Sequence, residues 1–558
     1  MRKFFLSFIL CLFVLAGLQA QTLKRSVTWE NICAHPAPLP VIGCLDHPAS
    51  SLDRPSLWSI GSETLDRDFA VFDKYIQYMG ETGVGYSRLQ SGWAKTEPRK
   101  GKYEFAWLDH QVDGLLEQGI HPWLCLCYGN PIYSDSGHDL NARIFTDGPV
   151  MDAWLKYVRQ TVRRYKGKVT MYEVWNEPDG AKPANGVKGE SWREYSNLFV
   201  RTAKVIREED PDAKIAALAA YSFSNGYFAN ALNEIKRLGG LEYIDYVTYH
   251  AYWSVPERII KRVKELQRLC AELNPSIKVL QGETGCPAQL EYGHALNNIE
   301  WSEYSQAKYD LRHMLINFSL GCPSSVFTMV DLNYGWMQQS YGLIRTNLKG
   351  EPQYKRPKFH AVRNVTSVFT PDLEADPEVR LSNSNCDLPM QVVGIRKVSC
   401  ALVSPSSADT ASRAAASPDC ASAATACESA SPACASAAAT ACESASPACA
   451  GKTVGVMLWL CGDRPTSSLE RRMLDISLTG ITFEDPVYVD MLTGLVHEIK
   501  DRCKNKPAPA GVVPDGAPIL AEASGVSIAR GACDIRKIPV WDSPILVIER
   551  SAIRLAAE

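Results

Sequence analysis

The pattern that most limits the fold of this chain is an alternation of short apolar runs with longer amphipathic segments, from about residue 55 to 370. The runs are apolar throughout, which predicts strands buried on both faces, as in a parallel sheet covered by helices. We expect strands at 57–60, 86–90, 121–128, 170–175, 214–219, 243–250, 278–282 and 325–330. The intervening segments predict helices at 69–82, 106–118, 150–164, 191–208, 229–238, 257–273, 302–320 and 355–369.

About eight strand–helix units of this kind match a (β/α)8 TIM barrel. An open, doubly wound sheet is the alternative, but no glycine-rich phosphate loop follows any of the predicted strands. After residue 375 the rhythm changes to short strands separated by turn residues, at 391–397, 453–461, 474–479, 486–490 and 544–549. The expected fold class is therefore α/β, a TIM barrel followed by a smaller C-terminal all-β, sandwich-like domain.

The first twenty residues have the composition of a secretory signal peptide. Arg2 and Lys3 precede an apolar run from Phe4 to Gly17, and Leu18-Gln19-Ala20 offers a small-residue cleavage site. The run is too short to favour a spanning helix, and no later segment is long and apolar enough to cross a membrane. We expect an exported protein, in the periplasm, at the cell surface or in the medium.

The expected divisions are a signal peptide at 1–20, an N-terminal segment at 21–54, the barrel at 55–372 and the β domain at 373–558. A low-complexity insert at 404–450, an imperfect repeat rich in Ala, Ser and Cys, interrupts the β domain. It has almost no large apolar side chains with which to form a core. The strands at 391–397 and 453–461 look like two arms of a hairpin with this insert at its tip. A tolerated repeat expansion is favoured over a metal-binding or cross-linked spacer.

The strongest local motif follows the fourth predicted strand, where Tyr172-Glu173-Val174-Trp175 leads into Asn176-Glu177-Pro178. The C-terminal ends of the strands form the active face of a parallel barrel, so Glu177 lies where chemistry is expected. Asn176 beside it can donate a hydrogen bond to a ligand hydroxyl. Read alone, the tripeptide would still be compatible with an ordinary surface loop.

A second glutamate strengthens the case. Glu283 ends the seventh predicted strand, directly after Gly282. Strands four and seven lie across a barrel from each other, so both carboxylates can face one cavity. Glycoside hydrolysis needs such a pair. One carboxyl group is protonated and gives its proton to the leaving oxygen, and the other is ionised and attacks the anomeric carbon or activates water.

The sixth predicted strand ends in His250-Ala251-Tyr252. Alternation along a strand places His250 and Tyr252 on the same side. A tyrosine hydroxyl at this position could donate a hydrogen bond to the Glu283 carboxylate and keep it ionised. Alone, His250 would as often be an ordinary core histidine.

These motifs resemble clan A glycoside hydrolases, in which strands four and seven carry the carboxylates, and most of all family 39 and its relatives. The resemblance runs from about Trp58 to Phe369 and includes a W…E-P…G-x-Y-x-F-x-x-L-D segment that starts at Trp93. Many members carry a tryptophan after strand eight, where this chain has Val326-Phe327-Thr328 and then Trp336 five residues beyond Asp331. The resemblance implies sugar-binding roles for a set of residues beside the carboxylates: Asn176, His250, Tyr252, Arg88, Trp93, Tyr128, Asn130 and Trp336.

The resemblance further implies a retaining mechanism, with Glu177 as the acid/base and Glu283 as the nucleophile. The expected function is a secreted hydrolase of β-linked oligo- or polysaccharides, which needs no cofactor. The alternative is a catalytically inactive carbohydrate-binding or surface-structural protein on a barrel scaffold. The sequence does not fix the sugar, exo or endo action, or the oligomeric state.

Other classes of function have little support. The formal net charge of −3 offers no basic excess for nucleic acid. No H-x-H or H-E-x-x-H motif indicates a metal hydrolase, so no metal site is expected. No G-x-S-x-G elbow indicates a serine nucleophile. A carbohydrate substrate is the expected partner.

Overall fold

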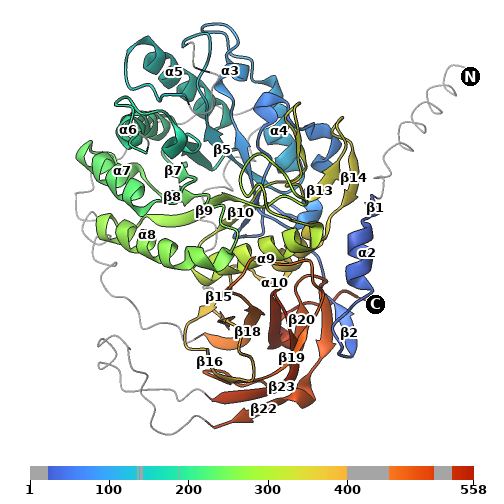
Figure 1. Cartoon of the computed structure of the whole chain (residues 1–558). Helices are drawn as coiled ribbons and strands as arrows, with labels where there is room; N and C mark the ends of the chain where they lie inside the picture. Colours follow the sequence, from blue (N-terminus) through green and yellow to red (C-terminus); the bar gives the residue numbers. More distant parts are fainter. Residues whose placement is uncertain are drawn as a thin grey trace, which may run out of the picture.

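The computed structural model describes residues 23–134, 137, 142–187, 189–398, 451–507 and 531–557. The predicted signal peptide and the insert at 404–450 lie outside the described residues. Within them, no helix combines the length and the apolar character that a membrane crossing needs. The described chain forms a helix-covered barrel with a β domain packed beneath it (Figure 1).

The predicted TIM barrel is confirmed: a parallel sheet closes on itself, because the eighth strand pairs with both the seventh and the first. In chain order its strands are β3 (Trp58–Gly61), β4 (Tyr86–Gln90), β5 (His121–Leu126), β6 (Met171–Val174), β7 (Lys214–Ala220), β8 (Tyr246–Tyr249), β9 (Lys278–Thr284) and β10 (Ser324–Val326). Every residue of these strands is buried except the first residues of β4, β5, β7, β8 and β9, which explains their continuous apolar character.

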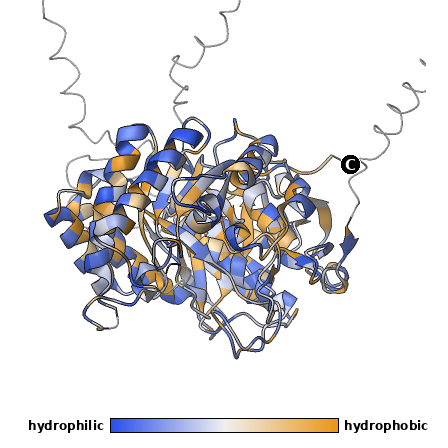
Figure 2. Cartoon of the chain, turned by 90° about the horizontal axis from the view of Figure 1, so that it is seen from above, coloured by the Kyte–Doolittle hydropathy of each residue, from blue (hydrophilic) through white to orange (hydrophobic). Residues whose placement is uncertain are grey.

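Helices form the outer layer and are α4 (Ala106–Glu117), α5 (Gly148–Tyr165), α6 (Trp192–Glu209), α7 (Asn225–Arg237), α8 (Ile259–Leu273), α9 (Glu303–Ser319) and α10 (Pro357–Val368). In α6, Tyr195, Leu198, Phe199, Thr202 and Ile206 are buried and recur at helical spacing. Figure 2 shows this mixture of hydrophobic and hydrophilic residues along the helices. In α4 to α8 one face covers the barrel and the other is more exposed, whereas α9 and most of α10 are buried.

The first connection differs from the prediction. The segment 69–82 was expected to be a helix but forms three 3₁₀ turns, Phe72–Lys74, Ile76–Tyr78 and Gly80–Thr82. The cause is local: Asp68 starts the segment with a left-handed φ of 59°, Tyr75 leaves helical geometry at φ −128°, and Gly83 ends it at φ 72°. Apolar spacing of three or four residues fits a 3₁₀ turn as well as an α-helix.

The C-terminal domain is a pair of antiparallel sheets, as predicted. One sheet has the order β15-β17-β18-β24-β20-β21-β2 and the other has the order β16-β19-β23-β22. Their strands are β15 (Leu373–Asp376), β16 (Arg380–Ser384), β17 (Met390–Lys397), β18 (Lys452–Leu460), β19 (Arg472–Thr479), β20 (Pro486–Asp490), β21 (Leu495–Glu498), β22 (Cys503–Lys506), β23 (Ala532–Val540) and β24 (Ile545–Glu549). The domain lies below α9 and α10 (Figure 1).

The β domain contains a hairpin that carries the insert and a strand from the N-terminal segment. β17 and β18 pair as antiparallel arms, with Lys397 opposite Lys452, so the insert leaves and rejoins the chain at one hairpin. The N-terminal segment contributes β2 (Val41–Cys44), which adds an edge strand by pairing with β21. Residues from both ends of the chain therefore build one sheet.

Charged contacts attach the two domains. Lys308 on α9 is buried, and its Nζ lies 2.6 Å from Oδ1 of Asp542 in the β domain. Trp459 of β18 donates its indole N–H to Glu257, which also pairs with Arg312 on α9. These contacts hold α9, a helix of the outer layer of the barrel, against the sandwich.

Candidate active site

The carboxyl ends of the strands surround a cavity of about 590 Å³. Its walls are formed by Glu63, Thr64, Arg67, Gln90, Tyr128, Asn176, Glu177, Tyr221, Ser222, Tyr252, Trp253, Glu283, His294, Ala295, Leu296, Phe327, Tyr334 and Gln339. A larger hollow of about 900 Å³ lies between the opposite end of the barrel and the sandwich, next to Leu57 and Pro323. We take the smaller cavity as the candidate site because it contains both predicted carboxylates at the active face of the barrel.

Glu177 leaves β6 on an unusual backbone. Trp175 and Glu177 both adopt left-handed φ values, 69° and 50°. Pro178 then opens a 3₁₀ turn (Pro178–Gly180), and Asp179 fixes it by accepting backbone N–H groups from the segment after β7. Non-glycine residues held in this region cluster at functional sites. The turn directs Glu177 into the cavity.

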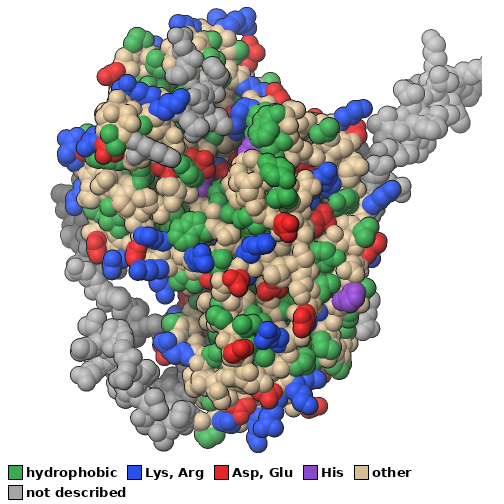
Figure 3. Space-filling model, in the orientation of Figure 1, with side chains coloured by type: hydrophobic (Ala, Val, Ile, Leu, Met, Phe, Trp, Pro, Cys, Tyr) green, Lys and Arg blue, Asp and Glu red, His purple; other side chains and the backbone are tan. Residues whose placement is uncertain are grey.

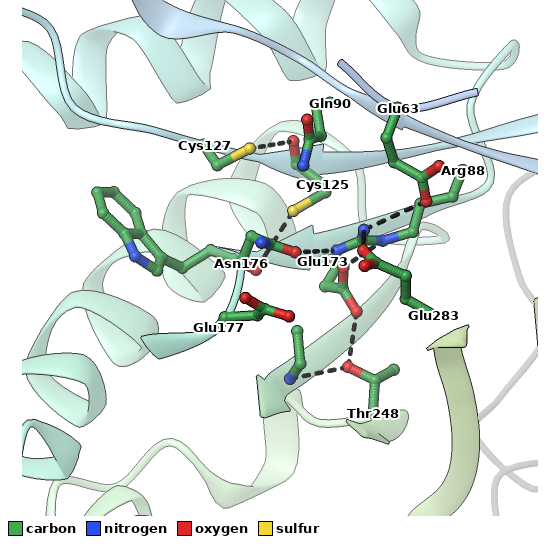
Figure 4. Close-up of polar contacts among 12 residues, drawn as sticks. Glu63, Arg88, Gln90, Cys125, Cys127, Glu173, Asn176, Glu177, Thr248 and Glu283 are labelled. Atoms are coloured by element: carbon green, nitrogen blue, oxygen red, sulfur yellow. Dashed lines mark hydrogen bonds and ion pairs between the residues drawn. The ribbon is translucent and has the colours of Figure 1, made fainter. Parts of the chain in front are cut away.

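Arg88 on β4 is the buried centre of the site (Figure 4). Its guanidinium donates to Oε2 of Glu173 at 2.5 Å, to Oδ1 of Asn176 at 2.8 Å and to Oε2 of Glu283 at 2.8 Å. Glu63 lies farther away, at 3.4 Å from Nη1. A single guanidinium thus orients groups from strands β6 and β9 and partly neutralises a cluster of carboxylates.

Glu283 accepts hydrogen bonds on both carboxylate oxygens. Arg88 binds Oε2, and the Tyr252 hydroxyl donates to Oε1 at 2.5 Å. Burial and the neighbouring Glu283 carboxylate raise the pKa of Tyr252 well above its ordinary value, so this hydroxyl remains a donor. Both contacts fix the orientation of the Glu283 carboxyl group, which is what a nucleophile requires.

Glu177 has a different environment. Oε1 of Glu177 lies 2.9 Å from Nδ1 of His250, and about a third of its side chain is exposed in the cavity. Burial raises the pKa of Glu177, while the hydrogen bond from His250 opposes this shift. For His250, burial lowers the pKa, but the Glu283 and Glu177 carboxylates outweigh burial and raise it. A raised pKa suits a group that must start the reaction protonated.

The two carboxyl groups are close. One oxygen of Glu177, one oxygen of Glu283 and a ring nitrogen of His250 all lie within 4.8 Å of one another. Carboxyl groups of retaining glycosidases are about 5–5.5 Å apart, against about 6.5–9.5 Å in inverting ones. These three groups could also present ligand atoms to a metal ion, and two of them, Glu177 and His250, share a hydrogen bond.

Among the predicted sugar-binding residues, Tyr128, Asn176 and Tyr252 line the cavity. The Asn176 amide donates to the Tyr128 hydroxyl at 2.8 Å, which ties strand ends β5 and β6 together. Arg88 and His250 lie directly behind the wall and hold the two carboxylates. The structure therefore brings most of the predicted set to one place.

Trp93 and Asn130 require a correction, because neither lines the cavity. Trp93 is 0% exposed, and its indole N–H donates to Glu97. Asn130 is buried and donates to the backbone oxygen of Glu97 at 2.9 Å. Both residues fix the Glu97 loop rather than present a surface to a sugar. The large ring of Trp93 is buried among aromatic neighbours such as Trp154 and Tyr157.

Trp336 also lies outside the cavity wall, at 70% exposure on the loop beyond β10. Phe327, directly after β10, supplies the aromatic ring in the wall at that strand. The position after strand eight is thus occupied by a phenylalanine, and Trp336 lies at the rim.

Sequence reasoning missed Glu63, which follows the first barrel strand. It is 1% exposed, and a side chain at Gly61 would collide with its carboxyl group, 1.8 Å from the added carbon. Burial and the Glu283 carboxylate raise the pKa of Glu63 to about 8, although Arg88 opposes the shift. Its position at a strand end was the available signal. Arg67, His294 and Tyr334 in the wall were also missed.

Comparison with known proteins gives one family match and several similar folds. Residues 88–271 match the family described as Glycosyl hydrolases family 39. The matched segment includes Arg88, Glu177, His250 and Tyr252 and ends before Glu283. A solved family 39 glycoside hydrolase from the gut symbiont Bacteroides cellulosilyticus WH2 is 14% identical, with a TM-score of 0.55 over 89% of this chain and 82% of that chain.

Two further solved structures have lower TM-scores. A monomeric beta-xylosidase from Caulobacter crescentus CB15 is 18% identical, with a TM-score of 0.44 over 64% of this chain and 75% of that chain. A beta-glucosidase from Thermotoga maritima is 13% identical, with a TM-score of 0.42 over 58% of this chain and 99% of that chain.

The barrel, the paired carboxylates and the matched segment define a retaining glycoside hydrolase. Over residues 88–271 the chain is similar to the family described as Glycosyl hydrolases family 39.

Proposed function

We propose that the protein is an exported glycosidase that cleaves β-linked oligo- or polysaccharides through a covalent glycosyl-enzyme. The observation that carries the mechanism is the Glu177–Glu283 pair, whose facing oxygens lie within 4.8 Å in one cavity. The predicted signal peptide supports export, and the open mouth of the barrel supports a sugar chain as substrate.

In the first step, an oxygen of Glu283 attacks the anomeric carbon while Glu177 gives its proton to the glycosidic oxygen. The glycosidic bond breaks, the leaving sugar departs as an alcohol, and an ester joins the glycone to Glu283. Arg88 and Tyr252 hold the attacking carboxylate in place before the bond forms. Glu177 ends this step as an anion beside the His250 ring.

In the second step, Glu177 removes a proton from water, and the water oxygen attacks the anomeric carbon. The ester bond breaks and returns Glu283 to its carboxylate form, while Glu177 regains its proton. Two inversions at one carbon retain the anomeric configuration. The raised pKa of His250 favours the protonated ring, which stabilises the Glu177 anion between the two steps.

The test is a hydrolysis screen of the protein from residue 21 onward. Aryl α- and β-glycosides and plant and host polysaccharides would be offered to the wild type and to Glu283→Ala. We expect turnover on at least one β-glycoside, absent from the variant. Turnover confined to α-glycosides would contradict the proposed linkage, and equal turnover by Glu283→Ala would contradict the catalytic assignment. Binding to a glycan without turnover would favour the inactive carbohydrate-binding alternative.

A further inference from the structure

The rim of the cavity carries a column of aromatic rings that the mechanism does not use. Tyr334, His294 and Trp336 follow one another, with ring centroids 4.4 Å apart for Tyr334–His294 and 5.4 Å for His294–Trp336. We call these three residues the aromatic ledge. Tyr334 and His294 line the cavity, whereas Trp336 extends beyond it. The column therefore leads from the catalytic cavity to the outer surface.

Two loops build the ledge. His294 belongs to the loop after β9, the strand that carries Glu283. Tyr334 and Trp336 belong to the tip of a hairpin formed by β11 (Leu332–Asn333) and β12 (Gln338–Gln339). The Tyr334 N–H donates to the Met337 oxygen at 3.0 Å and closes that tip. The outer ring is thus mounted on a hydrogen-bonded turn.

The indole of Trp336 is held in position but remains open to solvent. Its ring plane lies 23° from that of His294, which covers one face. A side-chain carbon at Gly293 would come within 2.8 Å of the indole, so the ring rests against bare backbone there. Trp336 is nevertheless 70% exposed, which leaves a large flat apolar surface uncovered. Ordering such a ring before binding reduces the entropy lost when a ligand covers it.

His294 contributes more than contact area. Its backbone is left-handed, with φ 67°, a conformation that is uncommon for non-glycine residues and that clusters at functional sites. Burial lowers the pKa of His294, which favours the neutral form of the ring under the indole. Its Nε2 atom is buried and has no hydrogen-bond partner among the described residues. A ligand hydroxyl at the cavity wall could supply that partner.

The surroundings of the ledge indicate which kind of ligand would bind to it. Figure 3 looks onto this face of the barrel and shows hydrophobic side chains gathered beside a hollow that contains acidic and histidine side chains. Exposed aromatic surface that continues into a polar cavity suits a ligand with apolar C–H faces and polar edges. Sugar rings have that form, and a chain of them would extend from the cleavage point along the column.

We propose that the aromatic ledge is a binding subsite for sugar units next to the one bound in the cavity, so that the enzyme acts on chains rather than on single glycosides. This inference rests on the proposed glycosidase function. It assigns Trp336 a role outside the catalytic cavity, one or more sugar units away from the cleaved bond.

The test compares Trp336→Ala and Trp336→Phe with the wild type. Hydrolysis of 4-nitrophenyl β-glycosides and of the matching oligosaccharides, from two to six units, gives kcat/KM as a function of chain length. We expect the ratio of kcat/KM on the six-unit chain to that on the aryl glycoside to fall about tenfold in Trp336→Ala, mainly through KM, and to be partly restored by Phe. Leu348→Ala, which changes a comparably exposed loop residue, is the control.

Retardation of each protein in native gels that contain soluble polysaccharide tests binding without turnover. Retardation of the wild type that Trp336→Ala loses would support the ledge even if no substrate were hydrolysed, which separates it from the proposed function. The subsite proposal would be overturned if Trp336→Ala changed neither the ratio of kcat/KM on the six-unit chain to that on the aryl glycoside nor the retardation in the gel. A shift of the variant from dimer to monomer in size-exclusion chromatography, without either effect, would instead make the ledge a contact between copies.

Discussion

The Tyr252 hydroxyl donates a hydrogen bond to Oε1 of Glu283 at 2.5 Å. The two residues lie on different segments, after β8 and within β9, and meet where both strands end in the cavity. Because Arg88 binds the other oxygen, the carboxylate has no freedom to rotate away from a substrate above it.

Removing the tyrosine hydroxyl should therefore impair the attack. In Tyr252→Phe we expect kcat/KM on aryl glycosides to fall about a hundredfold, because one fixed donor to the reacting carboxylate is lost. Steady-state kinetics beside circular dichroism would measure the loss in a folded protein. A decrease of less than about twofold would show that Arg88 alone positions Glu283.

The acid/base assignment makes a prediction about leaving groups. In Glu177→Gln the loss should be about 10²–10⁴-fold on glycosides with poor leaving groups, and much smaller with 2,4-dinitrophenyl, which departs without a proton. A series of aryl glycosides with graded leaving-group acidity would measure this. An equal loss across the series would assign protonation to another group.

The raised pKa of Glu177 also predicts how kcat/KM depends on pH. Because burial raises the pKa of Glu177, wild-type kcat/KM should decline only above the pH at which an ordinary glutamate ionises. The decline follows loss of the proton that the leaving oxygen needs. In Glu177→Gln, with an activated substrate, this alkaline decline should disappear. A pH–rate profile identical to that of the wild type would place the controlling group elsewhere.

Glu63 predicts a pH effect on stability. Its pKa is raised from an ordinary 4.5 to about 8 in the folded protein, so between these values the folded state holds a proton that the unfolded state has released. The stabilisation from this proton is complete below about pH 4.5 and is lost as the pH rises through about 8. The free energy of unfolding of the wild type should thus fall across this window, on the order of a few kcal/mol relative to Glu63→Gln.

Urea titrations at several pH values would measure that difference. Arg88, Glu283, Tyr75 and Tyr334 are the charged or titratable groups that influence Glu63, and Glu63→Gln leaves all of them in place. The exposed Glu104→Gln variant is the control. Parallel stability curves for wild type and Glu63→Gln would show that Glu63 is ionised throughout.

Replacing Arg88 should strongly lower the free energy of unfolding. In Arg88→Met the carboxylates of Glu173 and Glu283 lose their buried cation, so the free energy of unfolding should fall by about 3–5 kcal/mol. The matched variant Arg99→Met removes an exposed pair with Glu104 and should cost less than about 1 kcal/mol. Urea unfolding of both variants would measure these values. Equal small losses would mean that the buried cluster is not held by Arg88.

The barrel was predictable because all its strands are buried and therefore appear in the sequence as plain apolar runs. The segment 69–82 was not, because apolar spacing does not separate an α-helix from successive 3₁₀ turns. The pairing of β2 with β21 joins segments far apart in the chain, and no local pattern encodes that contact.

At the site, Glu177, Glu283 and Tyr252 could be predicted because they end strands that share one edge of the barrel. Trp93 could not be placed, because an aromatic residue near an active site can serve the core or the ligand, and only burial separates the two. The network around Arg88 depends on side-chain geometry across four strands. Glu63 acquires its properties from that network rather than from its neighbours in sequence.

The most direct test of the central claim is to trap the glycosyl-enzyme. The wild type would be incubated with a 2-deoxy-2-fluoro-β-glycoside of the sugar found in the substrate screen, carrying a 2,4-dinitrophenyl leaving group, and then digested for mass spectrometry. The account predicts one fluorosugar per chain, attached to Glu283, and no adduct in Glu283→Ala. An adduct on a different residue, or hydrolysis of the unmodified glycoside with inversion at the anomeric carbon, would contradict it.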